Sequence, residues 1–200
     1  MANVPGIPVY KEIGATPAPA TATNTARVVI VGAGPVGLAM ALDLGRRGHE
    51  VVVLTRLDFI AHASKAICFS KRSLDILDRL GAGDASVEKG VTWNVGKVFW
   101  GAGDEPVYQF DMLPVKDQKR PGFINIQQYY VEEHLLEGVE KLPNVEIRWG
   151  HRVDAVTPLN DGAELAVTAD EGGAYTLRAE WLIACDGARS TVRDRLGLDF

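Results

Sequence analysis

The stretch "RVVIVGAGPVGLAMALDLGRRGHEVVVLTRLD", residues 27–58, decides the fold of this chain. Val28 to Val31 and Val51 to Leu54 are short unbroken apolar runs, the pattern of parallel strands that are covered on both faces. Between them, a segment from about Val36 to Arg47 has the composition of a helix and stops at Gly48, which suits a left-handed helix cap. The stretch therefore predicts a strand–helix–strand (βαβ) unit and an α/β fold.

Three glycines in this stretch, Gly32, Gly34 and Gly37, have the spacing of a dinucleotide-binding turn. Gly32 allows the tight turn from strand to helix, Gly34 lets the backbone approach a pyrophosphate, and Gly37 lets helix and strand pack closely. A phosphate would meet the free N–H groups and the positive dipole of the helix N-terminus. We predict a nucleotide site here, and the alternative is a packing turn without a ligand.

Thr55 stands where dinucleotide folds generally place an acidic residue at the end of the second strand. A carboxylate accepts two hydrogen bonds from a ribose, whereas a threonine hydroxyl makes one. Arg56 and Asp58 are the candidates to replace the missing group. We therefore expect the nucleotide to be held more weakly at its ribose, or in a shifted pose.

Composition limits the classes of protein to be considered. The chain has 200 residues, with 46% hydrophobic and 24% charged residues, which is typical of one globular domain or of a domain and part of another. A formal net charge of −5 without a basic stripe argues against a nucleic-acid partner. No apolar run approaches the roughly 20 residues of a membrane span, and no secretory signal is present, so a cytoplasmic location is expected.

Cysteines and histidines indicate neither a disulfide framework nor a metal site. Cys68 and Cys185 are far apart and lack the spacing of a metal-binding pair. The histidines stand singly and are interpreted as ordinary surface or partly buried side chains; they are His49, His62, His134 and His151.

Outside the βαβ unit, the residue composition and the expected secondary structure change several times along the chain. Residues 1–25 are rich in Pro, Ala and Thr and are expected to form a flexible leader, or a strap across the domain, with order beginning at Arg27. "KRSLDILDRLG" (71–81) predicts a helix with Leu74, Leu77 and Leu80 on one face. Residues 87–123 carry aromatic and β-branched residues among Gly and Pro, which favours short strands.

The last third of the chain predicts a further helix and several strands. "QQYYVEEHLLEGVEKL" (127–142) has a helical pattern, and "NVEIRWG" (144–150) follows as a strand. Runs around 165–168 and 175–178 flank "DEGGA" and predict a hairpin. "WLIACDGARSTVRDRLG" (181–197) predicts a buried strand, a turn at Asp186–Gly187 and a short helix.

The motif "CDGARSTVR" (185–193) places Asp186 directly after a predicted strand. At the carboxyl end of a parallel strand, its carboxylate would face the crevice where α/β sheets bind ligands, and it would accept hydrogen bonds from sugar or ribityl hydroxyls. Alternatively, Asp186 would cap the helix that starts near Ser190. The motif alone leaves both interpretations open.

Taken together, "GAGPVG" (32–37) and "CDGARSTVR" resemble one family, the FAD-dependent aromatic hydroxylases typified by p-hydroxybenzoate hydroxylase. "AICFSKRSLDILDRLG" (66–81) and "INIQQYYVEEHLL" (124–136) resemble the branch that contains 3-(3-hydroxyphenyl)propionate hydroxylases. The resemblance spans Arg27 to Leu198. It implies a Rossmann-like FAD-binding domain over 26–86 and 124–200, with 87–123 as a β-rich excursion that begins a substrate domain.

The resemblance also implies which residues contact FAD. Ser64, Lys65 and Ala66 match a position where a cation lies over the FAD ribose and phosphate. The expected cofactor-binding set is Gly32, Gly34, Pro35, Val36 and Gly37 around the pyrophosphate, Thr55 and Arg56 at the ribose, Ser64, Lys65 and Ala66, Gln128 near the phosphate and ribityl region, Val153 beside the adenine, and Asp186 with Gly187 at the ribityl chain.

The activity implied by the resemblance is hydroxylation of a phenolic or other aromatic substrate with O2, through a flavin hydroperoxide, with NADH or NADPH as the reductant. No residue of this segment is identified as a catalytic acid or base. A further FAD motif of the family would lie beyond residue 200, so we expect an N-terminal fragment, and a homodimer is one candidate assembly. The alternatives are another FAD-dependent dehydrogenase or reductase, or a non-catalytic nucleotide-binding module.

Overall fold

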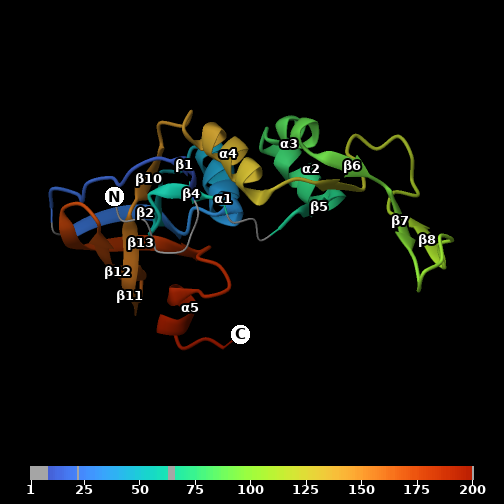
Figure 1. Cartoon of the computed structure of the whole chain (residues 1–200). Helices are drawn as coiled ribbons and strands as arrows, with labels where there is room; N and C mark the ends of the chain where they lie inside the picture. Colours follow the sequence, from blue (N-terminus) through green and yellow to red (C-terminus); the bar gives the residue numbers. More distant parts are fainter. Residues whose placement is uncertain (1–8, 22, 63–65, 200) are drawn as a thin grey trace.

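A six-stranded sheet forms the centre of the chain (Figure 1). The computed structural model describes residues 9–21, 23–62 and 66–199. The strand order is β10–β3–β2–β13–β12–β11, of which the first four are parallel and the last two complete an antiparallel meander. The strands are β2 (Thr23–Val31), β3 (Val51–Thr55), β10 (Val145–Trp149), β11 (His151–Leu159), β12 (Gly162–Ala169) and β13 (Gly173–Ala184). The predicted α/β fold is confirmed.

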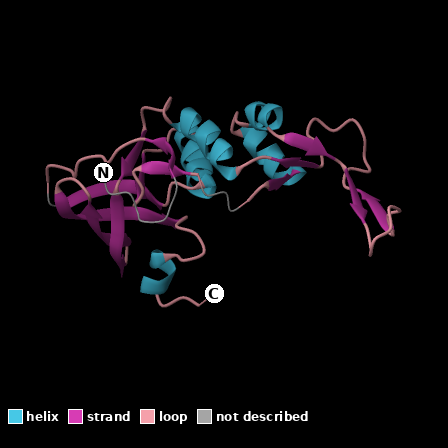
Figure 2. Ribbon diagram, viewed as in Figure 1, coloured by secondary structure: helices cyan, strands magenta, loops and turns pink. Residues whose placement is uncertain are grey.

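Two helices cover one face of the parallel strands (Figure 2). They are α1 (Pro35–Arg46) and α4 (Gln128–Val139), which pack against each other. Alternate residues of β2 and β3 point toward these helices, and the buried side chains on this face include Ile30, Val53, Leu38, Leu42 and Leu135. The predicted helices and the left-handed Gly48 (φ 83°) are confirmed.

The opposite face of the parallel strands packs on the meander. Val29, Val31 and Leu54 point to this side and form a second apolar core with Leu165 and Val167 of β12. Helix α5 (Thr191–Arg195) adds a buried valine to the same core. Both faces of β2 and β3 are thus covered, as their unbroken apolar runs predict.

A smaller antiparallel sheet lies on the other side of the helices (Figure 1). Its strands are β5 (Cys68–Ser70), β9 (Phe123–Asn125) and β6 (Val91–Trp93), and the hairpin of β7 (Val95–Val98) and β8 (Tyr108–Asp111) follows it. Helix α2 (Lys71–Arg79) buries the three predicted leucines. Short strands were expected from Val87 onward, but Val87 lies in helix α3 (Gly83–Lys89), and the first strand of this region begins at Val91.

The expectation that order begins at Arg27 is wrong. Val9–Glu12 form β1, which pairs with β4 (Phe59–Ala61), and β2 already begins at Thr23. Of the two alternatives for residues 1–25, a flexible leader or a strap, the strap is confirmed from residue 9 to 18, and residues 1–8 lie outside the described residues. Its order depends on pairing with distant residues, among them Phe59, Trp149 and Glu171, which the local composition does not reveal.

Two expectations about burial also need correction. The predicted hairpin strand and the predicted "WLIA" strand are one strand, β13, and Trp181 in its second half is 67% exposed instead of buried. His151 is not a surface or partly buried side chain, since only 1% of it is exposed. Within the described residues, no helix is long and apolar enough to cross a membrane.

Candidate nucleotide-binding site

The carboxyl ends of the parallel strands bring the two sequence motifs to one edge of the sheet. Val31, the last residue of β2, pairs with Leu54 of β3 on one side and with Ala184 of β13 on the other. The glycine turn that follows β2 therefore lies beside the turn that begins at Cys185. Ligands of open α/β sheets bind at this edge, so this is the candidate nucleotide site.

Gly32 sits at the closest approach between the two motifs. Its φ is 106°, and its N–H donates to the Leu54 carbonyl at 2.7 Å. A Cβ at Gly32 would lie 2.4 Å from the carbonyl oxygen of Cys185, and a Cβ at Gly37 would lie 1.8 Å from the carbonyl oxygen of Gly32. Both glycines are required by the fold itself, because any side chain would collide with backbone.

Gly34 is different, because nothing lies within 4 Å of the position of a Cβ there. Its φ of −79° is open to any residue, and it caps α1 without a side-chain hydrogen bond. Pro35 has no N–H, and the N–H groups of Val36 and Gly37 lie in the first helical turn, where no intrahelical acceptor exists. Open space in front of these donors fits an anionic phosphate.

Thr55 is buried at the end of β3, with 7% of it exposed. Its Oγ1 accepts a hydrogen bond from the Leu57 N–H at 3.3 Å. The hydroxyl proton remains available for one donated bond. Arg56 follows with an exposed side chain, at a position from which it can extend toward a ligand at this edge.

Asp186 caps α5 in this structure. Ser190 Oγ donates to Asp186 Oδ1 at 2.6 Å, and the Val192 N–H donates to Oδ2 at 3.2 Å. Asp186 thus contributes to capping α5, whose N-cap residue is Ser190, and each carboxylate oxygen keeps a further lone pair for a ligand hydroxyl. Gly187 has a φ of 86° and open space around it. Burial, reinforced by the Asp186 charge, raises the pKa of the Cys185 thiol.

The remaining expected contacts are distributed over other elements. Gln128 is the first residue of α4 and its Nε2 donates to Glu132 Oε1 at 2.7 Å. Val153 of β11 is buried in the same core as Val31 and Leu54, beneath the carboxyl edge. Ser64 and Lys65 lie outside the described residues, and Ala66 beside them is half-buried.

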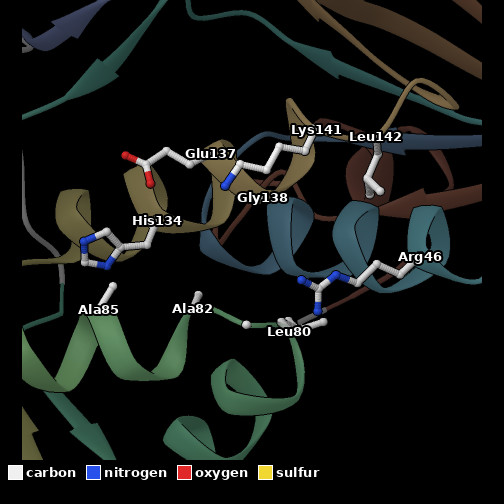
Figure 3. A pocket seen from close by; sticks show the side chains of 10 residues that line it. Arg46, Leu80, Ala82, Ala85, His134, Glu137, Gly138, Lys141 and Leu142 are labelled. Atoms are coloured by element: carbon white, nitrogen blue, oxygen red, sulfur yellow. The ribbon is translucent and has the colours of Figure 1, made fainter.

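A pocket elsewhere on the surface does not belong to this site (Figure 3). It lies among Arg46 at the end of α1, the link between α2 and α3, and Lys141 after α4. Arg46 is separated from Gly34 by the whole of α1, roughly 18 Å at the rise of an α-helix.

One neighbour of the site is missed by sequence reasoning. The strap residue Thr16 contacts Trp149, which pairs with Thr55, and it also contacts the buried His151. No periodicity or turn signal in the Pro- and Ala-rich strap indicates these contacts.

Comparison with known proteins gives a consistent result. A family model described as an FAD binding domain matches residues 25–200. The para-nitrophenol 4-monooxygenase of Pseudomonas sp. (strain WBC-3) is 37% identical over 175 residues, which are 86% of this chain and 43% of that protein. The 3-(3-hydroxy-phenyl)propionate/3-hydroxycinnamic acid hydroxylase of Escherichia coli (strain SMS-3-5 / SECEC) is 32% identical over 181 residues, which are 88% of this chain and 32% of that protein.

Solved structures agree with these relatives. The p-nitrophenol 4-monooxygenase PnpA from Pseudomonas putida DLL-E4 superposes with a TM-score of 0.82 at 36% identity, over 88% of this chain and 45% of that one. The flavin-dependent monooxygenase PieE, solved with FAD and substrate, has a TM-score of 0.75 at 27% identity, over 90% of this chain and 33% of that one. The chain thus spans less than half the length of these relatives.

Proposed function

The chain belongs to the FAD-binding domain family, and from this premise we propose that it is the FAD-holding part of an NAD(P)H-dependent aromatic monooxygenase. Its proposed substrates are a phenolic or other aromatic compound and O2. The observation that carries the proposal is the meeting of the glycine turn and the Asp186 turn at one sheet edge. The relatives with both sequence and fold similarity are aromatic monooxygenases, which favours hydroxylation over the FAD-dependent dehydrogenase or reductase.

In this proposal, each part of the site holds one part of FAD. The open space at Gly34 and the first N–H groups of α1 receive the pyrophosphate, and Thr55 with Arg56 faces the ribose of the adenosine. The free lone pairs of Asp186 accept hydroxyls of the ribityl chain. Gln128 and the 64–66 segment complete the proposed set, and the division at residues 87 and 123 into cofactor and substrate domains is part of the same proposal.

FAD, when bound, supplies the redox chemistry: it takes electrons from NADH or NADPH and activates O2. The chain contributes binding and orientation, because the groups around the glycine turn are held by backbone hydrogen bonds and do not need to reorganise. No described side chain at this edge is assigned a role as general acid or base.

Gly34 provides a sharp test. A Gly34→Val side chain would fill the space proposed for the pyrophosphate, yet it meets no protein atom within 4 Å of its Cβ position and needs no unusual φ. We expect the purified variant to remain folded and to melt only a few degrees below wild type, since a valine at this N-cap position costs about 1 kcal/mol. We also expect it to lose the flavin absorbance spectrum after reconstitution with FAD.

Gly103→Val is the control, because a Cβ at Gly103 would come no closer than 4.0 Å to any neighbour, the Trp100 carbonyl oxygen, and Gly103 lies in the β7–β8 hairpin. This variant should bind FAD like wild type. If Gly34→Val binds FAD as tightly as wild type, the pyrophosphate is not held at the glycine turn. If the wild-type chain itself takes up no FAD, the proposed function fails for this chain. Acceleration of NAD(P)H oxidation by phenols separates a hydroxylase from a nucleotide-binding module.

A further inference from the structure

Residues 9–18, the N-terminal strap, run beside the carboxyl edge of the sheet next to Thr55. The N–H groups of Ile13 and Gly14 donate to the Asp58 carbonyl at 3.1 and 2.8 Å, and the Thr16 N–H donates to the Trp149 carbonyl at 2.9 Å. Trp149 pairs with Thr55 at the end of β3, and Asp58 lies three residues after Thr55. The strap therefore contacts Asp58, in the loop that follows β3, and also Trp149, the strand neighbour of Thr55.

The strap is also anchored at its two ends. At one end, the Tyr10 hydroxyl donates to Glu133 Oε2 of α4 at 2.8 Å, and its ring lies 4.4 Å from that of Tyr129. At the other end, the Ala18 N–H donates to the Glu171 carbonyl at 2.7 Å. The match to the family model covers residues 25–200, so the strap lies outside the matched residues.

His151 is the buried side chain that holds the middle of the strap. Its Nε2 lies 3.0 Å from the Thr16 carbonyl oxygen, which can only accept, so Nε2 carries the proton and donates. Nδ1 then accepts from the Tyr175 hydroxyl at 2.8 Å, and the Tyr175 oxygen accepts from Arg148 Nη1 at 3.3 Å. Every member of this chain of hydrogen bonds is satisfied only when the imidazole is neutral.

We propose that His151 is a positioning residue for the adenosine end of the nucleotide: it fixes Thr16, and the strap then holds the Thr55–Asp58 loop in its binding geometry. The inference rests on the proposed function. In this proposal His151, which lies outside the glycine turn, influences the affinity for adenosine. The residue expected to contact the ribose, Thr55, has no carboxylate. A site with a single hydroxyl at this position depends more strongly on how firmly its loop is held.

Burial lowers the pKa of the His151 imidazole, and the charge of Arg148 on β10 acts in the same direction. The hydrogen bond to the Thr16 carbonyl and the charges of Glu146 on β10 and Asp170 after β12 oppose this shift, and Tyr175 of β13 is neutral. Protonation would remove the acceptor at Nδ1 and leave the Tyr175 hydroxyl proton without its partner. The donation from Nε2 to the Thr16 carbonyl persists in the protonated imidazole, so mild acid should leave the anchor of the strap in place.

The experiment uses the full chain and two probes, ADP and inorganic pyrophosphate, in calorimetric titrations. ADP reports on the adenosine end together with the phosphates, and pyrophosphate reports on the glycine turn alone. His151→Leu should weaken ADP about tenfold, the loss of roughly 1.4 kcal/mol, and leave pyrophosphate binding unchanged. His151→Gln, which keeps a donor and an acceptor, should recover most of this affinity.

Hydrogen exchange of the protein without ligand tests the clamp directly. In His151→Leu, the amides of Gly14 and Gly150, which donate to Asp58 and Leu57, should exchange faster, whereas His134→Leu, a histidine of the remote pocket, should leave them unchanged. Unchanged exchange in His151→Leu overturns the clamp. Faster exchange with unchanged or tighter ADP binding overturns the positioning role.

The two failures can be told apart. A wild-type chain that binds pyrophosphate but not ADP contradicts this inference and leaves the glycine turn intact as a phosphate site. A wild-type chain that binds neither contradicts the proposed function as well. Equal loss of ADP and pyrophosphate affinity in His151→Leu would show general damage to the site, and would also overturn the positioning role.

Discussion

Thr55 is the residue at which this site departs from dinucleotide-binding folds. Its hydroxyl already accepts from the Leu57 N–H, which leaves its proton and one lone pair for a ribose. A carboxylate at this position would accept two hydroxyl protons from a ribose. Thr55 therefore offers the proposed ribose contact fewer acceptor sites than a carboxylate and no charge.

Replacing Thr55 by Glu should tighten FAD. A hydrogen bond to a charged group contributes about 1.5–3 kcal/mol, so the expected gain is roughly tenfold or more in the dissociation constant, measured by fluorescence titration. Thr55→Gln, of similar size but uncharged, should gain less. An unchanged or weaker FAD affinity in Thr55→Glu would show that the ribose does not lie at this residue.

The contact of Asp186 with α5 and its proposed contact with FAD can be separated by mutating Ser190. Ser190→Ala removes the hydroxyl that donates to Asp186 and that also accepts from the Arg193 N–H, so it should cost about 1 kcal/mol of unfolding free energy. It should leave FAD affinity within about threefold of wild type, since the carboxylate is still present. Asp186→Ala should lower both stability and FAD affinity. Equal FAD affinity in Asp186→Ala and wild type would assign Asp186 to capping alone.

At the level of elements, the contact between α1 and α4 stabilises the helical layer. Leu42 of α1 is fully buried and lies against Gly138 of α4, where a Cβ would come within 2.9 Å of its Cδ2. The two helices thus approach closely because one of them lacks a side chain at the contact.

Leu42→Ala should therefore leave a cavity and lower the unfolding free energy by about 2–5 kcal/mol, measured by urea denaturation. Leu198→Ala, at a position that is 59% exposed, is the control and should change stability by roughly 0.5 kcal/mol or less. Similar effects in the two variants would contradict the assignment of the α1–α4 contact to the core.

Elements with a strong local pattern were predictable. The apolar runs of β2 and β3, the turn glycines and the leucines of α2 all carry periodicity or turn chemistry within a dozen residues. Helix α3 was not predictable, because "GDASVEK" has little apolar periodicity. Its buried residue Ser86 is polar, and the Ser86 hydroxyl donates a hydrogen bond to the Ala82 carbonyl. Strand β11 was missed for a similar reason, since it contains Pro158 and alternates imperfectly around a bulge between Val153 and Ala155.

The candidate site was predictable to the extent that backbone geometry defines it. Gly32 and Gly187 have positive φ, which glycine adopts easily, and Gly37 leaves room for the Gly32 carbonyl. The capping partners of Asp186 and the buried network of His151 depend on contacts between distant segments, Thr16 and Tyr175 among them. Such contacts are set by the assembled fold, and no local rule gives them.

For the whole molecule, mild acid should lower stability. Burial lowers the pKa of His151, so near pH 6 the unfolded chain binds more protons than the folded chain. The stabilisation from neutral His151 is complete above about pH 6.5 and is lost as the pH falls through the lowered pKa.

The melting temperature should therefore fall between about pH 7.5 and 5.5, and His151→Gln should reduce this fall because glutamine does not titrate. His134→Gln is the matched control and should leave the fall as it is in wild type. Parallel melting curves of wild type and His151→Gln over this range would contradict a neutral, buried His151.

The position of β13 in the sheet has a consequence for synthesis on the ribosome. β2 pairs with β3 soon after both are made, but its other neighbour is β13, whose partner residue for Val31 is Ala184. Contacts between segments so far apart form late, because the intervening chain must be made and ordered first. Until β13 has been made, the glycine turn lies beside an unpaired strand edge, and the proposed cofactor site is complete only when residues near 186 have left the ribosome.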